Sequence, residues 1–159
     1  MKIDHPIPPV FDQNSRILIL GSFPSVKSRE TAFFYGHPQN RFWRVVSAIY
    51  QENTPVTIPE RRDFLLRHYI AVWDVVKSCE ITGSSDASIR CAEVNDIRVI
   101  LERAPIEEIF VNGKTAAKLY QKFTEPICGR QAYQLPSTSP ANAVWSLNKL
   151  IAQWSVIVR

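Results

Sequence analysis

Three short segments of this 159-residue chain carry the side chains best suited to chemistry. They cover residues 21–25, residues 35–43 and residues 135–142. These segments supply amides, hydroxyls and aromatic rings but almost no carboxylates. Aromatic rings and amides together suit the binding of a neutral planar ring. We therefore predict a pocket for a flat heterocycle, in which an amide rather than an acid holds a water molecule.

The first and third of these segments are expected to follow strands. A buried apolar run at residues 15–20 predicts a strand that stops at Gly21 and Pro24, and residues 132–135 predict another strand just before the third segment. Open α/β sheets bind ligands at the carboxyl ends of their strands. The two loops are therefore expected to meet at one edge of a sheet.

The remaining pattern alternates strands with helices. Strands are expected at residues 70–76 and 108–111, and the Ser-, Thr- and Gly-rich stretch 79–88 is expected to be a loop. Helices are expected to begin at Asn40, Thr57, Asn95, Lys114 and Pro140. This alternation predicts the α/β class: a three-layer α/β/α sandwich with a central four-stranded parallel sheet. We expect one domain over residues 1–159, with residues 1–14 as an N-terminal extension.

The composition of the chain indicates the kind of partner it binds and where in the cell it is located. The net charge of +4 and the isoelectric point near 9.1 favour an anionic partner such as nucleic acid. Residues 1–9 resemble neither a signal nor a transit peptide, and no apolar run approaches membrane-spanning length. We expect a cytoplasmic protein that does not bind membranes.

The cysteines argue against a metal centre or a disulfide framework. There are three, Cys79, Cys91 and Cys128, with no pair at the Cys-x-x-Cys spacing. We therefore expect reduced thiols, no zinc or iron–sulfur cluster and no cofactor.

Two familiar catalytic motifs are disfavoured. Residues 112–115 resemble the end of a phosphate-binding loop, but Glu108 stands where its first glycine belongs, so a turn before a helix is favoured. No Gly-x-Ser-x-Gly elbow surrounds Ser22, Ser25, Ser137 or Ser139, and only three histidines are present, so a Ser-His-acid triad is disfavoured.

Several residues allow both a structural and a functional interpretation. His37 before Pro38 is favoured as a local hydrogen-bonding group, and Asn40 alone would be an ordinary helix N-cap. The aromatic residues 33–35 before Asn40 favour a role in a binding site, because rings held on a loop suit stacking on a base, whereas Phe42 and Trp43 after it are expected in the core. Basic side chains near the same loops could follow a phosphate backbone: Lys27, Arg29, Arg41, Arg44, Lys114, Lys118 and Lys122.

The segments at residues 21–25 and 35–43 resemble the uracil-DNA glycosylase superfamily. Within it they are most similar to the hypoxanthine-DNA (deoxyinosine) glycosylase branch, often called family 6. The run of His37, Pro38 and residues 40–43 also resembles the mismatch-specific uracil branch. The likeness covers residues 15–159 in the order of motifs and of strands and helices. It implies a glycosylase that flips a deaminated base, with hypoxanthine favoured, out of DNA and hydrolyses its N-glycosidic bond.

The resemblance also implies roles for individual residues. Much of the superfamily carries a water-orienting Asp, Asn or Glu at the position of Phe23, so Asn40 becomes the candidate for that role. Ser137 stands where many relatives have a histidine that stabilises the leaving base, which implies a narrow substrate range. Base-binding positions are expected at Gly21, Ser22, Phe23, Pro24, Ser25, Tyr35 and His37. DNA-binding positions are expected at Lys27, Arg41, Ser139, Pro140, Ala141 and Asn142.

Other interpretations of the activity remain open. One keeps the superfamily but changes the substrate to uracil, including uracil in G·U mismatches. Another is a DNA-binding module of the same fold without catalysis. No lysine lies in these motifs as a Schiff-base nucleophile, so we expect a monofunctional enzyme without strand cleavage. We expect it to act as a monomer on DNA containing a deaminated base.

Overall fold

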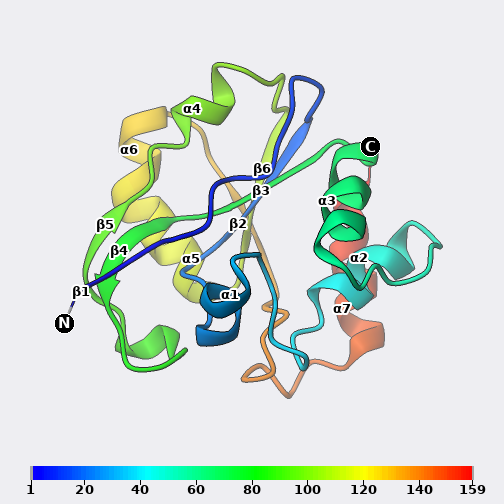
Figure 1. Cartoon of the computed structure of the whole chain (residues 1–159). Coiled ribbons are helices and arrows are strands. Elements are labelled where there is room, and N and C mark those ends of the chain that lie inside the picture. The colour runs from blue at the N-terminus through cyan, green and yellow to red at the C-terminus, as the bar shows by residue number, and fades with distance from the viewer. Residues whose placement is uncertain (1, 159) are drawn as a thin grey trace.

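The computed structural model describes residues 2–158 and contains two β-sheets, the larger of which is flanked by helices (Figure 1). The larger sheet has four strands in the order β3-β2-β6-β7, and every neighbouring pair is parallel. Its strands are β2 (Ile17–Gly21), β3 (Ile70–Asp74), β6 (Glu108–Asn112) and β7 (Tyr133–Leu135). The α/β class and the central four-stranded parallel sheet are therefore confirmed.

Helices cover both faces of this sheet because its strands alternate their apolar side chains. Ile17 and Ile19 of β2 pack with one group of helices, and Leu18 and Leu20 pack with the other. The first group is α2 (Phe42–Ile49), α3 (Ile58–Arg67) and α7 (Leu147–Trp154). The second group contains α4 (Arg98–Leu101) and α5 (Lys114–Leu119), and α5 continues through a π-helical turn (Tyr120–Thr124) into α6 (Glu125–Cys128). These helices and the sheet form the three expected layers.

A second sheet was not expected. It is antiparallel, in the order β1-β4-β5, and consists of β1 (Lys2–Asp4), β4 (Val76–Glu80) and β5 (Arg90–Val94). The expected strand at residues 70–76 is divided into the whole of β3 and the start of β4, and residues 79–80 of the expected loop belong to β4. The segment between β4 and β5 carries a short 3-10 turn (Asp86–Ser88). The amino-terminal segment is packed, because β1 pairs with β4 and Val10 forms a bridge with Val72; Met1 lies outside the described residues.

The helix ends confirm some sequence signals and correct others. The capping box at Thr57 is present, with the Glu60 N–H donating to Thr57 Oγ1 at 3.2 Å and the Thr57 N–H donating to Glu60 Oε1 at 3.0 Å. The last helix, however, begins at Leu147 after an N-cap at Ser146, not at Pro140. The chain before it forms turns instead, in which the Ala141 N–H donates to Ser139 Oγ.

Short helical segments complete the fold. A short helix α1 (Val26–Thr31) follows β2 and is capped by Ser25 Oγ, which accepts from the Ser28 N–H at 3.1 Å. The helix expected from Asn95 shortens to α4, and a 3-10 turn (Ser155–Ile157) follows α7. Within residues 2–158, no helix is both long and apolar enough to cross a membrane.

Candidate active site

A cavity of about 890 Å³ opens at the carboxyl ends of the four parallel strands. All three segments that the sequence singled out line it, together with the ends of β3 and β6. The predicted residues that line the cavity are Gly21, Ser22, Phe23, Pro24, Ser25, Tyr35, His37, Asn40, Ser137, Ser139, Pro140, Ala141 and Asn142. Lys27 and Arg41 are not among its lining residues. The loops after β2 and β7 therefore meet in one pocket, as expected at the carboxyl ends of parallel strands, and residues of the segment 35–43 join them.

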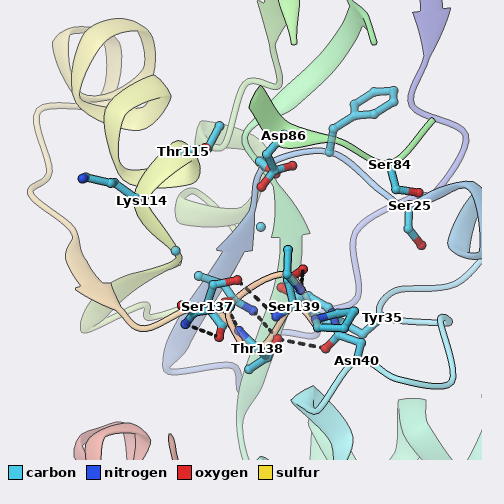
Figure 2. Close-up of a pocket in the computed structure, with 18 of the residues that line it drawn as sticks. Ser25, Tyr35, Asn40, Ser84, Asp86, Lys114, Thr115, Ser137, Thr138 and Ser139 are labelled. Atoms are coloured by element: carbon cyan, nitrogen blue, oxygen red, sulfur yellow. Dashed lines mark hydrogen bonds between the residues drawn. The ribbon is translucent and has the colours of Figure 1, made fainter. Parts of the chain in front are cut away.

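Asn40 is held in the pocket wall by its side-chain oxygen (Figure 2). Oδ1 accepts from the Phe42 N–H at 2.9 Å and from the Thr138 hydroxyl at 2.9 Å. The backbone N–H of Phe42 can only donate, so the carboxamide oxygen must face it. Both lone pairs of that oxygen are therefore engaged. The Asn40 NH₂ group remains available as a hydrogen-bond donor to a bound molecule.

Thr138 is the centre of the network behind Asn40. Its side chain is completely buried, and its hydroxyl accepts from Asn112 Nδ2 at 3.0 Å while donating to Asn40. Its backbone N–H donates to Asn112 Oδ1 at 3.1 Å, so the threonine uses both ends of that carboxamide. The network joins the end of β6 to both loops. From the sequence, Asn112 was considered only as part of a disfavoured phosphate-binding loop, and Thr138 was missed. Asn112 could have been found as a polar residue at the end of a buried strand.

Tyr35 stands against the same wall. Its ring stacks on Phe42 with a centroid distance of 4.0 Å and an interplanar angle of 14°. Burial raises the pKa of the Tyr35 phenol, and the nearby Asp74 carboxyl raises it further, so the hydroxyl stays protonated. The hydroxyl also explains Gly21: a Cβ at residue 21 would lie 3.1 Å from Tyr35 Oη and only 2.4 Å from Asp74 Oδ1.

Among the described residues, two carboxylates line the pocket, and both come from outside the three segments that predicted it. Asp74, at the end of β3, accepts from the buried His5 ring, with 2.7 Å between Nε2 and Oδ2. His5 Nδ1 accepts from the Ile7 N–H at 3.2 Å, which places the ring proton on Nε2. Asp86 comes from the 3-10 turn after β4, and its Oδ1 accepts from the Ser22 hydroxyl at 2.7 Å. Both acids lie far in sequence from the segments that predicted the pocket.

Other predicted residues make mainly local hydrogen bonds. His37 Nδ1 accepts from the Gln39 N–H at 3.1 Å, which is the local role that the sequence favoured. Ser137 Oγ accepts from the Ser139 N–H at 3.1 Å, and Asn142 Nδ2 donates to the Ser137 carbonyl at 3.0 Å. Phe23 is 7% exposed and packs with Val76 and Cys79, so most of its ring belongs to the core. These contacts fix the shape of the loops.

The two predicted basic residues differ sharply in their surroundings. Arg41 directs its guanidinium toward the third loop, where it donates to the carbonyls of Ser139 at 3.2 Å, Asn142 at 3.1 Å and Trp145. Lys27 is half exposed on α1 and lies 3.8 Å from Glu30 Oε2. Arg41 therefore holds the loop in place, whereas Lys27 is the more accessible cation.

The side chains of the pocket do not form a metal site. Among residues 2–158, no cluster of three or more His, Cys, Asp or Glu side chains is arranged to hold a metal ion. The three cysteines are not paired with one another.

Comparison with known proteins places the chain in a family. The model of the Uracil DNA glycosylase superfamily matches residues 8–156, so the chain belongs to this superfamily. It is 36% identical over 157 residues to a protein of Methanosarcina acetivorans named hypoxanthine DNA glycosylase, with 96% of each chain covered. It is 36% identical over 140 residues to a protein of the same name from Methanosarcina barkeri, with 85% of each covered. A solution NMR structure from Methanosarcina acetivorans, described provisionally as a uracil DNA glycosylase, superposes with a TM-score of 0.83 at 34% identity, covering 99% of this chain and 96% of that one.

Proposed function

We propose that this protein is a DNA glycosylase that removes hypoxanthine from DNA by flipping the nucleotide and hydrolysing its N-glycosidic bond, the first step of base excision repair. The observation that carries the proposal is Asn40, fixed through its oxygen by Phe42 and Thr138 so that its NH₂ group serves the pocket. Membership of the superfamily and the name shared by two relatives at 36% identity support the same activity and substrate.

The donors of the pocket match the charge that the reaction creates. Cleavage of an N-glycosidic bond leaves negative charge on the departing base and positive charge on the sugar. The sequence alone suggested that Asn40 holds the attacking water, but its engaged oxygen leaves only the NH₂ donor. We therefore assign Asn40 to the departing base, where a fixed donor stabilises developing negative charge. Ser137 and residues 21–25 line the same pocket. The Ser137 hydroxyl and the backbone N–H groups of this loop, apart from Pro24, add further donors.

The remaining predicted positions receive roles as binding groups. Tyr35 and Phe23 present aromatic surface to the flipped base, and His37 lies at the same pocket. Lys27 contacts the phosphate backbone, and residues 139–142 press against the DNA. Arg41 acts on the DNA indirectly, through the loop whose carbonyls it holds.

The reaction needs no covalent enzyme intermediate. Among the described residues that line the pocket, Lys114 is the one lysine, and it lies at the start of α5. We propose that it serves DNA binding rather than Schiff-base formation, so the enzyme is monofunctional. We also propose that the enzyme needs no cofactor and acts as a monomer. We place it in the cytoplasm.

A base-release assay tests this function. Matched duplexes that contain inosine, uracil or xanthine are incubated with the protein, and the abasic product is cleaved with alkali. We expect release of hypoxanthine well above release of uracil, and no adduct after borohydride trapping. Preferential uracil release would make the protein a uracil glycosylase, and binding without any release would make it a DNA-binding module. A trapped covalent adduct would contradict the monofunctional mechanism.

A further inference from the structure

Asp86 is a carboxylate of the pocket that the proposed mechanism leaves without a role. It belongs to the turn between β4 and β5 and is joined to Ser22, 64 positions earlier, by a 2.7 Å hydrogen bond. Ser22 is itself buried, in the loop that follows β2. Within residues 2–158, no hydrogen bond engages the second oxygen of Asp86. Figure 2 shows Asp86 across the pocket from Asn40 and Thr138.

The roles assigned so far include no acceptor for the protons of the attacking water, and Asp86 can serve as one. The water that attacks the sugar carbon must direct a lone pair to that carbon and its O–H bonds to an acceptor. Asn40 cannot serve as this acceptor, because Phe42 and Thr138 already occupy its oxygen. The developing positive charge on the sugar also requires a negative partner.

The other carboxylate of the pocket is less suited to the task. Asp74 is 3% exposed, and one of its oxygens is bound by the His5 ring. Its other oxygen lies so close to the backbone of Gly21 that a methyl group added there would clash with it. Asp86 reaches the pocket from a surface turn and keeps one oxygen open.

We propose that Asp86 is a further catalytic residue, which orients the attacking water, accepts its proton and stabilises the sugar cation. This inference rests on the proposed glycosylase function. The water oxygen forms a bond to the sugar carbon while the bond from that carbon to the base nitrogen breaks. The bonding electron pair leaves with the base, which takes a proton from solvent. The water's proton passes to the Asp86 carboxylate and then to solvent.

The surroundings of Asp86 predict a characteristic pH dependence. Partial burial of its carboxyl group raises the pKa of Asp86, the Ser22 hydroxyl lowers it and the negative charge of Asp74 raises it. The proposed role needs the ionised form, so the rate falls as the pH drops through this raised pKa, at a higher pH than for an ordinary aspartate. Other titratable or charged groups near this part of the site come from several elements: Arg29 of α1, Tyr35, Cys79 of β4 and Lys114 of α5.

The test is Asp86→Asn, measured by single-turnover release of hypoxanthine. Asparagine keeps an oxygen for the Ser22 hydroxyl, so it removes the charge without removing the hydrogen bond. We expect a rate about 100-fold lower, the lower end of what a general base contributes. Affinity for inosine-containing DNA should be preserved, and the acidic limb of the pH–rate profile should disappear. Asp86→Glu keeps the charge and should retain that limb.

Asp63→Asn is the matched control, because it makes the same change in net charge on the exposed face of α3, where Asp63 pairs with Arg67. It should release hypoxanthine at the wild-type rate. A rate for Asp86→Asn within about threefold of wild type, with the acidic limb intact, would overturn the role of Asp86 alone. Absence of hypoxanthine release by the wild-type protein would instead overturn the proposed function, and this inference with it.

Discussion

The hydroxyl of Thr138 donates to Oδ1 of Asn40 at 2.9 Å and so joins two loops that lie 98 positions apart in the sequence. The direction of this bond is fixed, because the same hydroxyl accepts from Asn112 Nδ2. Because this bond engages Oδ1 of Asn40, the NH₂ group of Asn40 is the part that can bind a molecule in the pocket. Thr138 is therefore a positioning residue for the group that we place at the departing base.

Removal of that hydroxyl tests the positioning role. Thr138→Val keeps the shape but leaves the Asn112 NH₂ group without its acceptor, in a buried place. We expect the free energy of unfolding to fall by about 1–3 kcal/mol and hypoxanthine release to slow by about tenfold. Thermal unfolding and single-turnover kinetics measure the two effects. Thr138→Ser restores the hydroxyl and should recover most of the rate; equal rates for the Val variant and wild type would remove Thr138 from the mechanism.

The three carbonyls bound by Arg41 predict an effect on the third loop rather than a simple loss of phosphate contact. Arg41→Met should increase amide hydrogen exchange at residues 139–145 and weaken DNA binding. Lys27→Ala is the comparison: it should weaken DNA binding slightly, reduce its salt dependence and leave loop exchange unchanged. If Arg41→Met behaved like Lys27→Ala in both measurements, Arg41 would be a direct phosphate ligand.

Val144 lies in the same loop and is 84% exposed, next to Trp145 of the pocket lining. An apolar side chain at this place suits filling of the gap that a flipped base leaves in the duplex. Val144→Ala should therefore slow hypoxanthine release from duplex DNA several-fold and leave release from single strands unchanged. Val56, 72% exposed before α3, supplies the control, and Val56→Ala should affect neither substrate. Equal slowing on both substrates would contradict this role for Val144.

Gly21 gives a prediction about the floor of the pocket. A methyl group there would lie 2.4 Å from Asp74 Oδ1, and the His5 ring holds this carboxylate in place through its other oxygen, Oδ2. Gly21→Ala should lower the free energy of unfolding by about 1–3 kcal/mol, as overpacking of a tight site does. Chemical denaturation measures this loss. A smaller loss when Gly21→Ala is made in an Asp74→Ala background than in wild type would confirm the clash as its cause, and unchanged stability of the single variant would refute it.

The strand pattern made much of this site predictable from sequence. The segments that became β2 and β7 are parallel strands of one sheet, so the loops after them share an edge. The same reasoning placed Ser137 beside residues 21–25. Asn40 and Tyr35 were instead assigned to the pocket from the aromatic residues near Asn40 and from the resemblance to the superfamily.

Asp86 and the second sheet could not be predicted in the same way. The residues of β5 are exposed or half-buried, so its sequence lacks a clear apolar strand pattern. The strand is defined by its antiparallel pairing with β4, which the sequence does not reveal. Asp86 reaches the pocket only because this hairpin folds against Ser22. The prediction of a helix from Pro140 was wrong for a local reason. Ser139 and Pro140 resemble a helix start, but turn hydrogen bonds and the contacts of Arg41 keep this segment non-helical.

The most direct measurement compares Asn40→Ala with Asn40→Asp in single-turnover release of hypoxanthine. Aspartate keeps an oxygen for the Phe42 and Thr138 donors, but it replaces the NH₂ donor with a negative charge facing the departing base. We predict that both variants fold like wild type and release the base at least about 100-fold more slowly. Wild-type activity in Asn40→Ala would contradict any catalytic role for this residue. High activity in Asn40→Asp alone would show that Asn40 serves the water and not the base.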